Sequence, residues 1–274
     1  MILGLLREAA ADVELAVRGV PVQSRSEEVG MGADGEPTTR VDRVAEDALI
    51  ARFETAPFPV TMISEEAGVL ELRAGPDPVK ILADPIDATV NACSGIPLYT
   101  TCLSAHCDGE TVASVVKNLA AGELYEADQR GARLDGVPVQ VRESALERAI
   151  VGFGPVIDEG PQRLLALMAR RASGVRLLAC PSLSMAQVGT GAMGAFVGLG
   201  RSRTGKGHRL FDVWAAAFFI RQAGGVVTDS AGEALPTHLE DLRSGTTVVA
   251  APPVLHESIL EIVAGLQSTG SPEP

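Results

Sequence analysis

The stretch Asp84-Pro85-Ile86-Asp87-Ala88-Thr89-Val90-Asn91 follows directly after the apolar run Val79-Lys80-Ile81-Leu82-Ala83. The apolar run predicts a strand. Proline fixes its own φ and disfavours helix at the residue before it, so we expect the strand to end in a turn that holds Asp87. Asp84 and Asp87 then face one point, where two carboxylates repel each other unless a cation lies between them. Oxygen ligands of this kind suit Mg²⁺ or Mn²⁺ better than Zn²⁺.

Two further segments present carboxylates beside apolar runs. Thr61-Met62-Ile63-Ser64 leads into Glu65-Glu66, and Phe211-Asp212 opens the apolar segment from Val213 to Ile220. Taken singly, each motif has a plainer interpretation. The glutamates suit a solvated loop, Asp212 suits a helix cap, and the first aspartate pair suits a polar turn. Only the three segments together favour a metal site.

In this order, the motifs resemble those of the inositol monophosphatase and fructose-1,6-bisphosphatase superfamily, whose members are Mg²⁺-dependent, lithium-sensitive phosphatases. The family pattern is a GEE or SEE loop, then DP(I/L)DGT, then WD or FD before a helix that ends in AGG. This chain carries Ser64-Glu65-Glu66, Asp84 to Asn91, Phe211-Asp212 and Ala223-Gly224-Gly225. Met31 to Asp42 is similar to the start of the archaeal-type members, which act on inositol phosphate or fructose bisphosphate.

The resemblance implies two or three Mg²⁺ ions in the active site, with Mn²⁺ as a substitute. Asp84 would bridge the first two ions, and Glu65 with waters would help to hold a weaker third. The implied ligands are Glu65, Asp84, the Ile86 carbonyl, Asp87, Thr89 and Asp212. Such cations neutralise phosphate oxygens, lower the pKa of bound water and stabilise the departing oxygen.

The same resemblance implies the reacting groups. Asp42, Thr89 and Glu65 would be catalytic, because Asp42 would accept a hydrogen bond from the Thr89 hydroxyl and this pair would orient and deprotonate the attacking water. The phosphate would be held at Asp87, Ala88 and Thr89, through backbone N–H groups at a helix N-terminus.

Two departures from the family pattern concern the substrate. Ala88 stands where most relatives have glycine, and a positive φ there would strain an alanine. Residues 198–209 replace a shorter loop that carries an acidic residue in relatives. This segment holds five potential cations in a chain of net charge −12. It is either a solvated loop or a positive lip for a second anion of the substrate. Its implied substrate-binding residues are Arg201, Arg203, Lys206 and Arg209.

Two other motifs are rejected as nucleotide-binding sites. Gly189 to Gly194 matches GxGxxG, but we expect a helix before it and a strand after it, the reverse of a dinucleotide fold. Gly200 to Gly207 nearly matches a P-loop, but Gly207 replaces the hydroxyl that would bind Mg²⁺.

Composition favours a soluble enzyme. The 274 residues are 46% hydrophobic, ample for a core, and contain no run of eighteen apolar residues. The N-terminus is expected to be an amphipathic helix and not a signal peptide. We therefore expect the four cysteines to be reduced and the protein to be cytoplasmic. The negative charge argues against nucleic acid as a partner.

Apolar periodicity predicts helices over residues 3–18 and 40–54, followed by antiparallel strands within 99–117 and 122–142. Turns are expected at Asp108-Gly109, Ala121-Gly122 and Asp135-Gly136. Beyond about residue 145 we expect strands over 149–153, 225–228 and 246–251, helices over 160–172, 212–223 and 253–267, and a disordered tail over 267–274. The resemblance implies an α+β fold with layered αβαβα architecture. Residues 1–145 would form an antiparallel-sheet part, and 146–274 an α/β part that carries Asp212.

The sequence thus predicts a Mg²⁺-dependent phosphomonoesterase for a small phosphorylated polyol or sugar, of the inositol monophosphate or fructose-1,6-bisphosphate type. One alternative is a biosynthetic phosphatase for a nucleotide-like or natural-product phosphate. The other is a family member that binds metal and ligand without catalysis. By resemblance alone, the protein is expected to be a homodimer.

Overall fold

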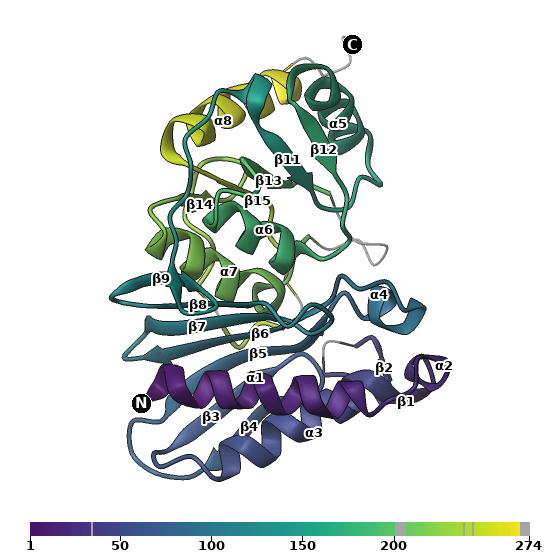
Figure 1. The fold of residues 1–274 in the computed structure, drawn as a ribbon, viewed down its shortest axis with the longest axis vertical. Helices are drawn as coiled ribbons and strands as arrows, with labels where there is room; N and C mark the ends of the chain where they lie inside the picture. The colour runs from purple at the N-terminus through teal and green to yellow at the C-terminus, as the bar shows by residue number, and fades with distance from the viewer. Residues whose placement is uncertain (34, 201–206, 238, 243, 269–274) are drawn as a thin grey trace.

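The computed structural model describes residues 1–33, 35–200, 207–237, 239–242 and 244–268. In this part of the chain, helices and sheets alternate as five layers (Figure 1). The order is a helix pair, an eight-stranded sheet, a second helix pair, a five-stranded sheet and a third helix pair. The predicted α+β fold with layered αβαβα architecture is confirmed.

The larger sheet is mostly antiparallel, as predicted, and only β3 and β5 pair in parallel. Its order is β10-β9-β8-β7-β6-β5-β3-β4. The strands are β3 (Val60–Ser64), β4 (Gly68–Arg73), β5 (Val79–Asp87), β6 (Thr100–Cys107), β7 (Glu110–Asn118), β8 (Leu124–Asp128), β9 (Gly131–Leu134) and β10 (Val137–Pro138). The three predicted turns are confirmed, with positive φ at Asp108, Gly109, Gly122, Asp135 and Gly136.

One face of the larger sheet is covered by α1 (Ile2–Arg18) and α3 (Arg40–Glu54), which confirms both predicted N-terminal helices. The apolar stripe of each helix packs on the sheet, as expected for amphipathic helices. Shorter elements near this layer are α2 (Val22–Arg25), β1 (Glu28–Met31), β2 (Pro37–Thr39) and α4 (Thr89–Ser94).

The other face packs on α6 (Pro181–Gly189) and α7 (Leu210–Gln222), which lie between the two sheets. Burial on both sides explains why α7 is apolar nearly all round its circumference. The second sheet has the order β12-β11-β13-β15-β14 and is covered outside by α5 (Glu159–Arg171) and α8 (Pro253–Ser268). Its strands are β11 (Ile150–Phe153), β12 (Gly174–Arg176), β13 (Ala195–Gly198), β14 (Val226–Thr228) and β15 (Val248–Ala251), and η1 (Leu146–Arg148) precedes them.

The C-terminal elements confirm the predicted helices and strands to within about two residues. The first sheet ends at Pro138 and the second begins at Ile150, so the predicted division at 145/146 falls between them. As a domain boundary it stays a prediction. The tail beyond residue 268 lies outside the described residues.

The prediction that the strand ends after Ala83 and passes directly into a turn is wrong. Strand β5 continues to Asp87, because β6 pairs with it at Asp84–Cys102 and again at Asp87–Thr100. Three steps along β5 oppose two steps along β6, so the extra residue forms a β-bulge. The proline lies inside this irregularity, where the ladder needs no N–H from it.

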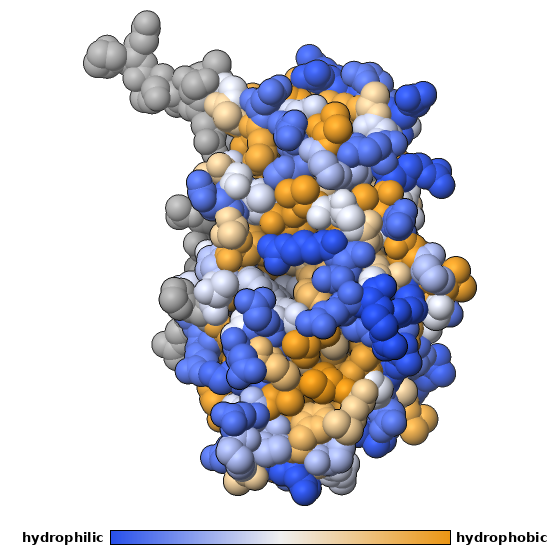
Figure 2. All heavy atoms as spheres, turned by 90° about the vertical axis from the view of Figure 1, so that its left-hand side faces the viewer, coloured by the Kyte–Doolittle hydropathy of each residue, from blue (hydrophilic) through white to orange (hydrophobic). Residues whose placement is uncertain are grey.

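Figure 2 shows one side of the molecule, on which hydrophobic residues gather in two areas separated by a band of hydrophilic residues.

Within the described chain, we find no helix long and apolar enough to cross a membrane. Cys93, Cys102, Cys107 and Cys180 are all free thiols.

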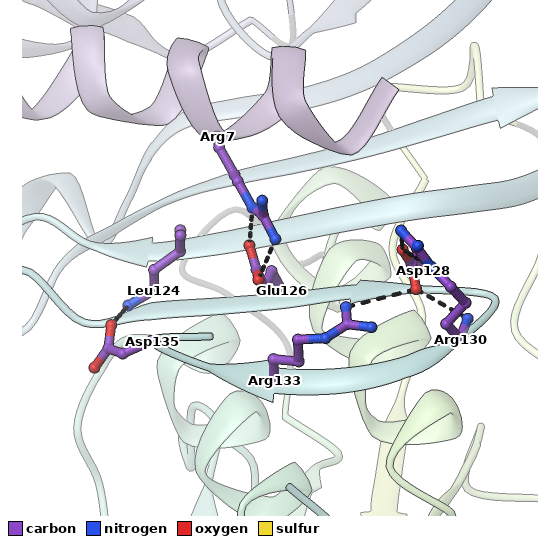
Figure 3. A network of polar contacts seen from close by, with 7 residues as sticks. All are labelled: Arg7, Leu124, Glu126, Asp128, Arg130, Arg133 and Asp135. Atoms are coloured by element: carbon purple, nitrogen blue, oxygen red, sulfur yellow. Dashed lines mark hydrogen bonds and ion pairs between the residues drawn. The ribbon is translucent and has the colours of Figure 1, made fainter. Parts of the chain in front are cut away.

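Helix α1 is joined to the larger sheet by an ion pair beneath it. Arg7 donates through Nε and Nη2 to the carboxylate of Glu126 on β8 (Figure 3). The Glu126 side chain is 1% exposed, whereas that of Arg7 is 45% exposed. Nearby, Asp128 accepts from Arg130 at the surface. Arg7 therefore compensates the negative charge of the buried Glu126 carboxylate.

We expect Arg7→Met to lower the free energy of unfolding by about 2–3 kcal/mol, because the buried Glu126 carboxylate loses its partner. Urea unfolding at pH 7.5 measures the effect. Arg130→Met is the matched control and should leave the midpoint almost unchanged, since that guanidinium is exposed. Equal losses from both variants would contradict the assignment.

Candidate active site

Carboxylates from four separate segments meet at the end of β5. Asp84 and Asp87 belong to β5, Asp42 to α3, Glu65 to the turn between β3 and β4, and Asp212 to α7. The negative charges of the other four all act on Asp84 and raise its pKa. The three sequence segments that favour a metal site only when taken together are therefore brought together by the fold.

Asp84 is the centre of this cluster. Its side chain is 1% exposed, and its Oδ1 atom has no hydrogen-bond partner. Burial first, and the surrounding carboxylates second, raise its pKa well above the ordinary value. A buried carboxylate oxygen without a donor, surrounded by like charges, is the environment that a hard cation stabilises. The donor set therefore fits Mg²⁺ or Mn²⁺ by its chemistry.

Asp42 and Thr89 are hydrogen-bonded to each other, as expected. The Thr89 hydroxyl donates to Asp42 Oδ1 at 2.9 Å and also lies 3.1 Å from the Ile86 carbonyl. The other oxygen of Asp42 accepts from the Thr39 hydroxyl at 2.7 Å and the Thr39 N–H at 3.1 Å, which forms the capping box of α3. Burial raises the pKa of Asp42, and the Thr39 and Thr89 donors oppose that rise.

Asp87 is turned toward α6. Its Oδ2 atom accepts from the Ser182 N–H at 3.0 Å, from the Ser182 hydroxyl, and from Cys180 Sγ at 3.3 Å. Burial raises the pKa of Asp87 to about 6, while the Ser182, Cys180 and Ala88 donors act in the opposite direction.

Asp212 does cap a helix. It is the third residue of α7, and its Oδ2 accepts from the Arg209 N–H at 3.1 Å. The Arg209 guanidinium is buried and donates to the Leu242 carbonyl. A cap uses part of a carboxylate and does not prevent a second oxygen from binding a cation. Capping and metal binding are thus compatible roles for Asp212.

The carboxylates do not yet form a coordination shell. Within the described ranges, no three histidine, cysteine, aspartate or glutamate side chains are placed so that they could hold a metal ion. Asp42, Asp87 and Asp212 are each turned to protein donors.

Ala88 has φ 71° and ψ 48°, so the condition under which an alanine is strained there is met. It precedes α4, and this left-handed conformation directs the chain from β5 into that helix. An alanine there is strained by roughly 1 kcal/mol or more relative to glycine.

The glutamate loop is tied to the β1–β2 segment and to α3. Thr38 donates through its hydroxyl to Glu66, and the Ala33 N–H donates to the Glu66 carbonyl at 2.9 Å. One residue before Glu65, the Ser64 hydroxyl donates at 2.6 Å to Glu46, which is fully buried. Burial raises the pKa of Glu46 to about 7.

A cavity of about 370 Å³ adjoins the carboxylates. Asp87 and Asp212 form its polar side, while Phe153, Pro155 and Leu177 are among its apolar walls. His208 also lines it, and its ring packs so closely on Gly154 that a Cβ there would lie 2.6 Å from Nε2. The cavity is a concave space directly beside the carboxylate cluster.

The structure therefore brings together some of the predicted site residues but not all of them. The carboxylates, Ile86, Ala88 and Thr89 come together, while Arg209 faces the Leu242 carbonyl and its substrate role stays a prediction. Arg201, Arg203 and Lys206 lie outside the described residues. Sequence reasoning missed Cys180, Ser182 and Glu46, because their sequence neighbourhoods show ordinary helix patterns. The only signal was Cys180-Pro181-Ser182, a helix start with two potential donors.

The model of the inositol monophosphatase family matches residues 3–268. The chain belongs to this family. Fructose-1,6-bisphosphatase/inositol-1-monophosphatase from Archaeoglobus fulgidus is 34% identical over 268 residues, which are 95% of this chain and 97% of that protein. Inositol-1-monophosphatase from Mesorhizobium japonicum is 30% identical, over 86% of each chain.

Solved structures show the same fold. The extragenic suppressor protein suhB from Bartonella henselae superimposes with a TM-score of 0.80 at 21% identity, covering 96% of this chain and 98% of its own. Family membership and the relatives identify the protein as a metal-dependent phosphatase, a phosphoric monoester hydrolase, with a small-molecule phosphate substrate.

We expect Ala88→Gly to stabilise this inositol monophosphatase family member by roughly 1 kcal/mol, because glycine adopts the left-handed conformation without strain. Thermal unfolding measures the change. Ala11→Gly, on the exposed side of α1, should have the opposite sign and cost about 1 kcal/mol. Destabilisation by both substitutions would show that Ala88 is not strained.

Glu46 should make stability depend on pH. Its folded pKa of about 7 lies above the ordinary value of 4.5, so the folded state favours the protonated form. Its contribution is fully present below about pH 4.5 and is lost as pH rises through about 7, a change of roughly 3 kcal/mol.

Glu46→Gln should therefore gain stability relative to the native protein between pH 5 and pH 8, as measured by urea unfolding at each pH. Glu54→Gln, on the exposed face of the same helix, is the control and should show a constant difference. A constant difference for Glu46→Gln as well would overturn this account.

Proposed function

We propose that the protein hydrolyses the phosphomonoester of a small phosphorylated polyol or sugar, of the inositol monophosphate or fructose-1,6-bisphosphate type. The observation that carries this proposal is the Thr89 hydroxyl bonded to Asp42 beside the buried, unpartnered oxygen of Asp84. A hydroxyl–carboxylate pair next to a cation site is suited to activating water. The names of the relatives support the substrate class.

The metal is proposed to be Mg²⁺, with two or three ions in the site and Mn²⁺ as a substitute. The proposed ligands are Glu65, Asp84, the Ile86 carbonyl, Asp87, Thr89 and Asp212. When bound, such ions would neutralise the phosphate, acidify the attacking water and stabilise the departing oxygen.

The protein's own groups have distinct tasks in this proposal. Thr89 passes its proton to Asp42 at Oδ1, which leaves the threonine oxygen able to accept a proton from water. The backbone N–H groups of Ala88 and Thr89 hold phosphate oxygens at the start of α4, beside Asp87. The leaving alcohol occupies the cavity beside Asp87 and Asp212. Glu65, whose charge acts on Asp84, would help to hold the metal ions.

The segment that precedes α7 in the sequence is proposed to bind the distal part of the substrate through Arg201, Arg203, Lys206 and Arg209. No feature of the described site favours a nucleotide-like substrate or a loss of catalysis over this function. A homodimer and a cytoplasmic location complete the proposal. The free thiols fit a reducing compartment, and the apolar areas in Figure 2 are surfaces that a second copy could cover.

Phosphate release from inositol 1-phosphate, fructose 1,6-bisphosphate, glycerol 2-phosphate and 5′-AMP tests the function. We expect Mg²⁺-dependent, lithium-inhibited release from the inositol or fructose phosphates. Release from AMP alone would contradict the substrate class, and release that persists in EDTA would contradict the metal mechanism.

Asp42→Asn tests the proton pathway. The asparagine can still cap α3, but it cannot take the Thr89 proton, so kcat should fall by about 10²- to 10⁴-fold. Metal affinity, measured by calorimetry, should stay close to that of the native protein, because Asp42 is not a proposed ligand. Asp158→Asn, at the N-cap of α5, is the control and should retain full activity. An active Asp42→Asn variant would remove Asp42 from the mechanism.

A further inference from the structure

One oxygen of Asp87 is the acceptor for an unusually complete set of donors. Asp87 Oδ2 receives the Ser182 N–H, the Ser182 hydroxyl and the Cys180 thiol. Ser182 is fully buried and Cys180 is 1% exposed, so water does not compete for these bonds. We call Asp87, Cys180 and Ser182 the carboxylate clamp.

The clamp exists because of how α6 begins. Cys180 is the N-cap of this nine-residue helix and Pro181, which has no N–H, is its first residue. The N–H of Ser182 therefore has no partner within the helix and needs an external acceptor. Asp87, far away in sequence on β5, provides that acceptor at the positive end of the helix.

A further hydroxyl lies behind Ser182. Thr100 Oγ1, on β6 beside Asp87 in the ladder, is 2.6 Å from Ser182 Oγ. Because the Ser182 proton points to Asp87, the Thr100 hydroxyl must donate to Ser182. The hydroxyl chain from Thr100 through Ser182 to Asp87 thus has one direction, and its donors reinforce one another.

We propose that Ser182 is a positioning residue for the metal site, which holds one oxygen of Asp87 so that the carboxylate is presented to the cation in a fixed orientation. Cys180 and Thr100 support it. This inference rests on the proposed function, in which Asp87 is a metal ligand. Donors behind a ligating carboxylate fix its orientation, and removing such a donor weakens metal binding by about 10- to 100-fold.

A helix cap alone would not need this arrangement. The Ser182 N–H already satisfies the cap, and an alanine at this position would keep it. The hydroxyl adds a second bond to the same oxygen and connects the metal site to β6. Its loss should therefore affect metal affinity more than folding, which separates a positioning role from a purely structural one.

The test is Mn²⁺ titration of the full-length protein by calorimetry, together with kcat at saturating Mn²⁺ and thermal unfolding in EDTA. We expect Ser182→Ala to weaken Mn²⁺ binding by about 10- to 100-fold. The kcat should return to within about threefold of native once metal saturates the site, because the variant keeps every reacting group. Thermal unfolding in EDTA should change little.

Ser184→Ala is the matched control. Ser184 belongs to the same helix and is equally buried, but its hydroxyl donates to the Cys180 carbonyl at 2.9 Å and does not contact Asp87. It should bind Mn²⁺ like the native protein. Equal losses of affinity in Ser182→Ala and Ser184→Ala would overturn the proposal in favour of a general effect on α6.

Asp87→Asn separates this inference from the proposed function. If Asp87→Asn loses Mn²⁺ affinity while Ser182→Ala does not, Asp87 is a ligand and the positioning role is wrong. If Asp87→Asn binds Mn²⁺ like the native protein, the metal assignment itself fails. Should Ser182→Ala not fold, Thr100→Val replaces it, because it removes the donor behind Ser182 without touching Asp87. It should weaken binding in the same direction, and native affinity would overturn the proposal.

Discussion

Mutual repulsion among carboxylates around Asp84 is the constraint on which the rest of the site depends. The Asp84 carboxyl is 1% exposed, and its pKa is raised by the negative charges of four neighbours: Glu65, Asp87, Asp212 and Asp42. Such a cluster is unfavourable unless donors or cations compensate it. The protein supplies donors to the outer members, through capping boxes for Asp42 and Asp212 and through α6 for Asp87. Asp84 keeps an oxygen without a donor, and in the proposed function a cation would bind there.

The layered fold is what brings these acids together. A single sheet edge could not bring this many acids to one point, because neighbouring strands present few side chains there. Helix α7 contributes Asp212 and α6 contributes Ser182, and both are fixed by burial between two sheets. The apolar surface of α7 thus stabilises the fold and places a charged side chain at its own N-terminus. Stability and function share one element here.

The sequence was informative where local pattern determines structure. Helices α1 and α3, the three glycine turns and the acidic motifs were predictable, because periodicity and turn chemistry are local. The end of β5 was not, since the bulge at Asp84–Asp87 depends on pairing with Thr100 and Cys102 far along the chain. The clamp was missed for the same reason: its bonds join β5 to α6, and no local pattern encodes such a contact.

The left-handed Ala88 and the clamped Asp87 act on the same short stretch. A residue with φ 71° turns the chain out of β5 directly after Asp87, whose carboxylate accepts donors from α6. An extended residue there would continue the strand and carry Thr89 away from Asp42. The strain at Ala88 thus accompanies the placement of Thr89 beside Asp42, while the donors at Ser182 hold Asp87, which is a metal ligand in the proposed function. Strain retained at such a position indicates that the surrounding structure over-determines it.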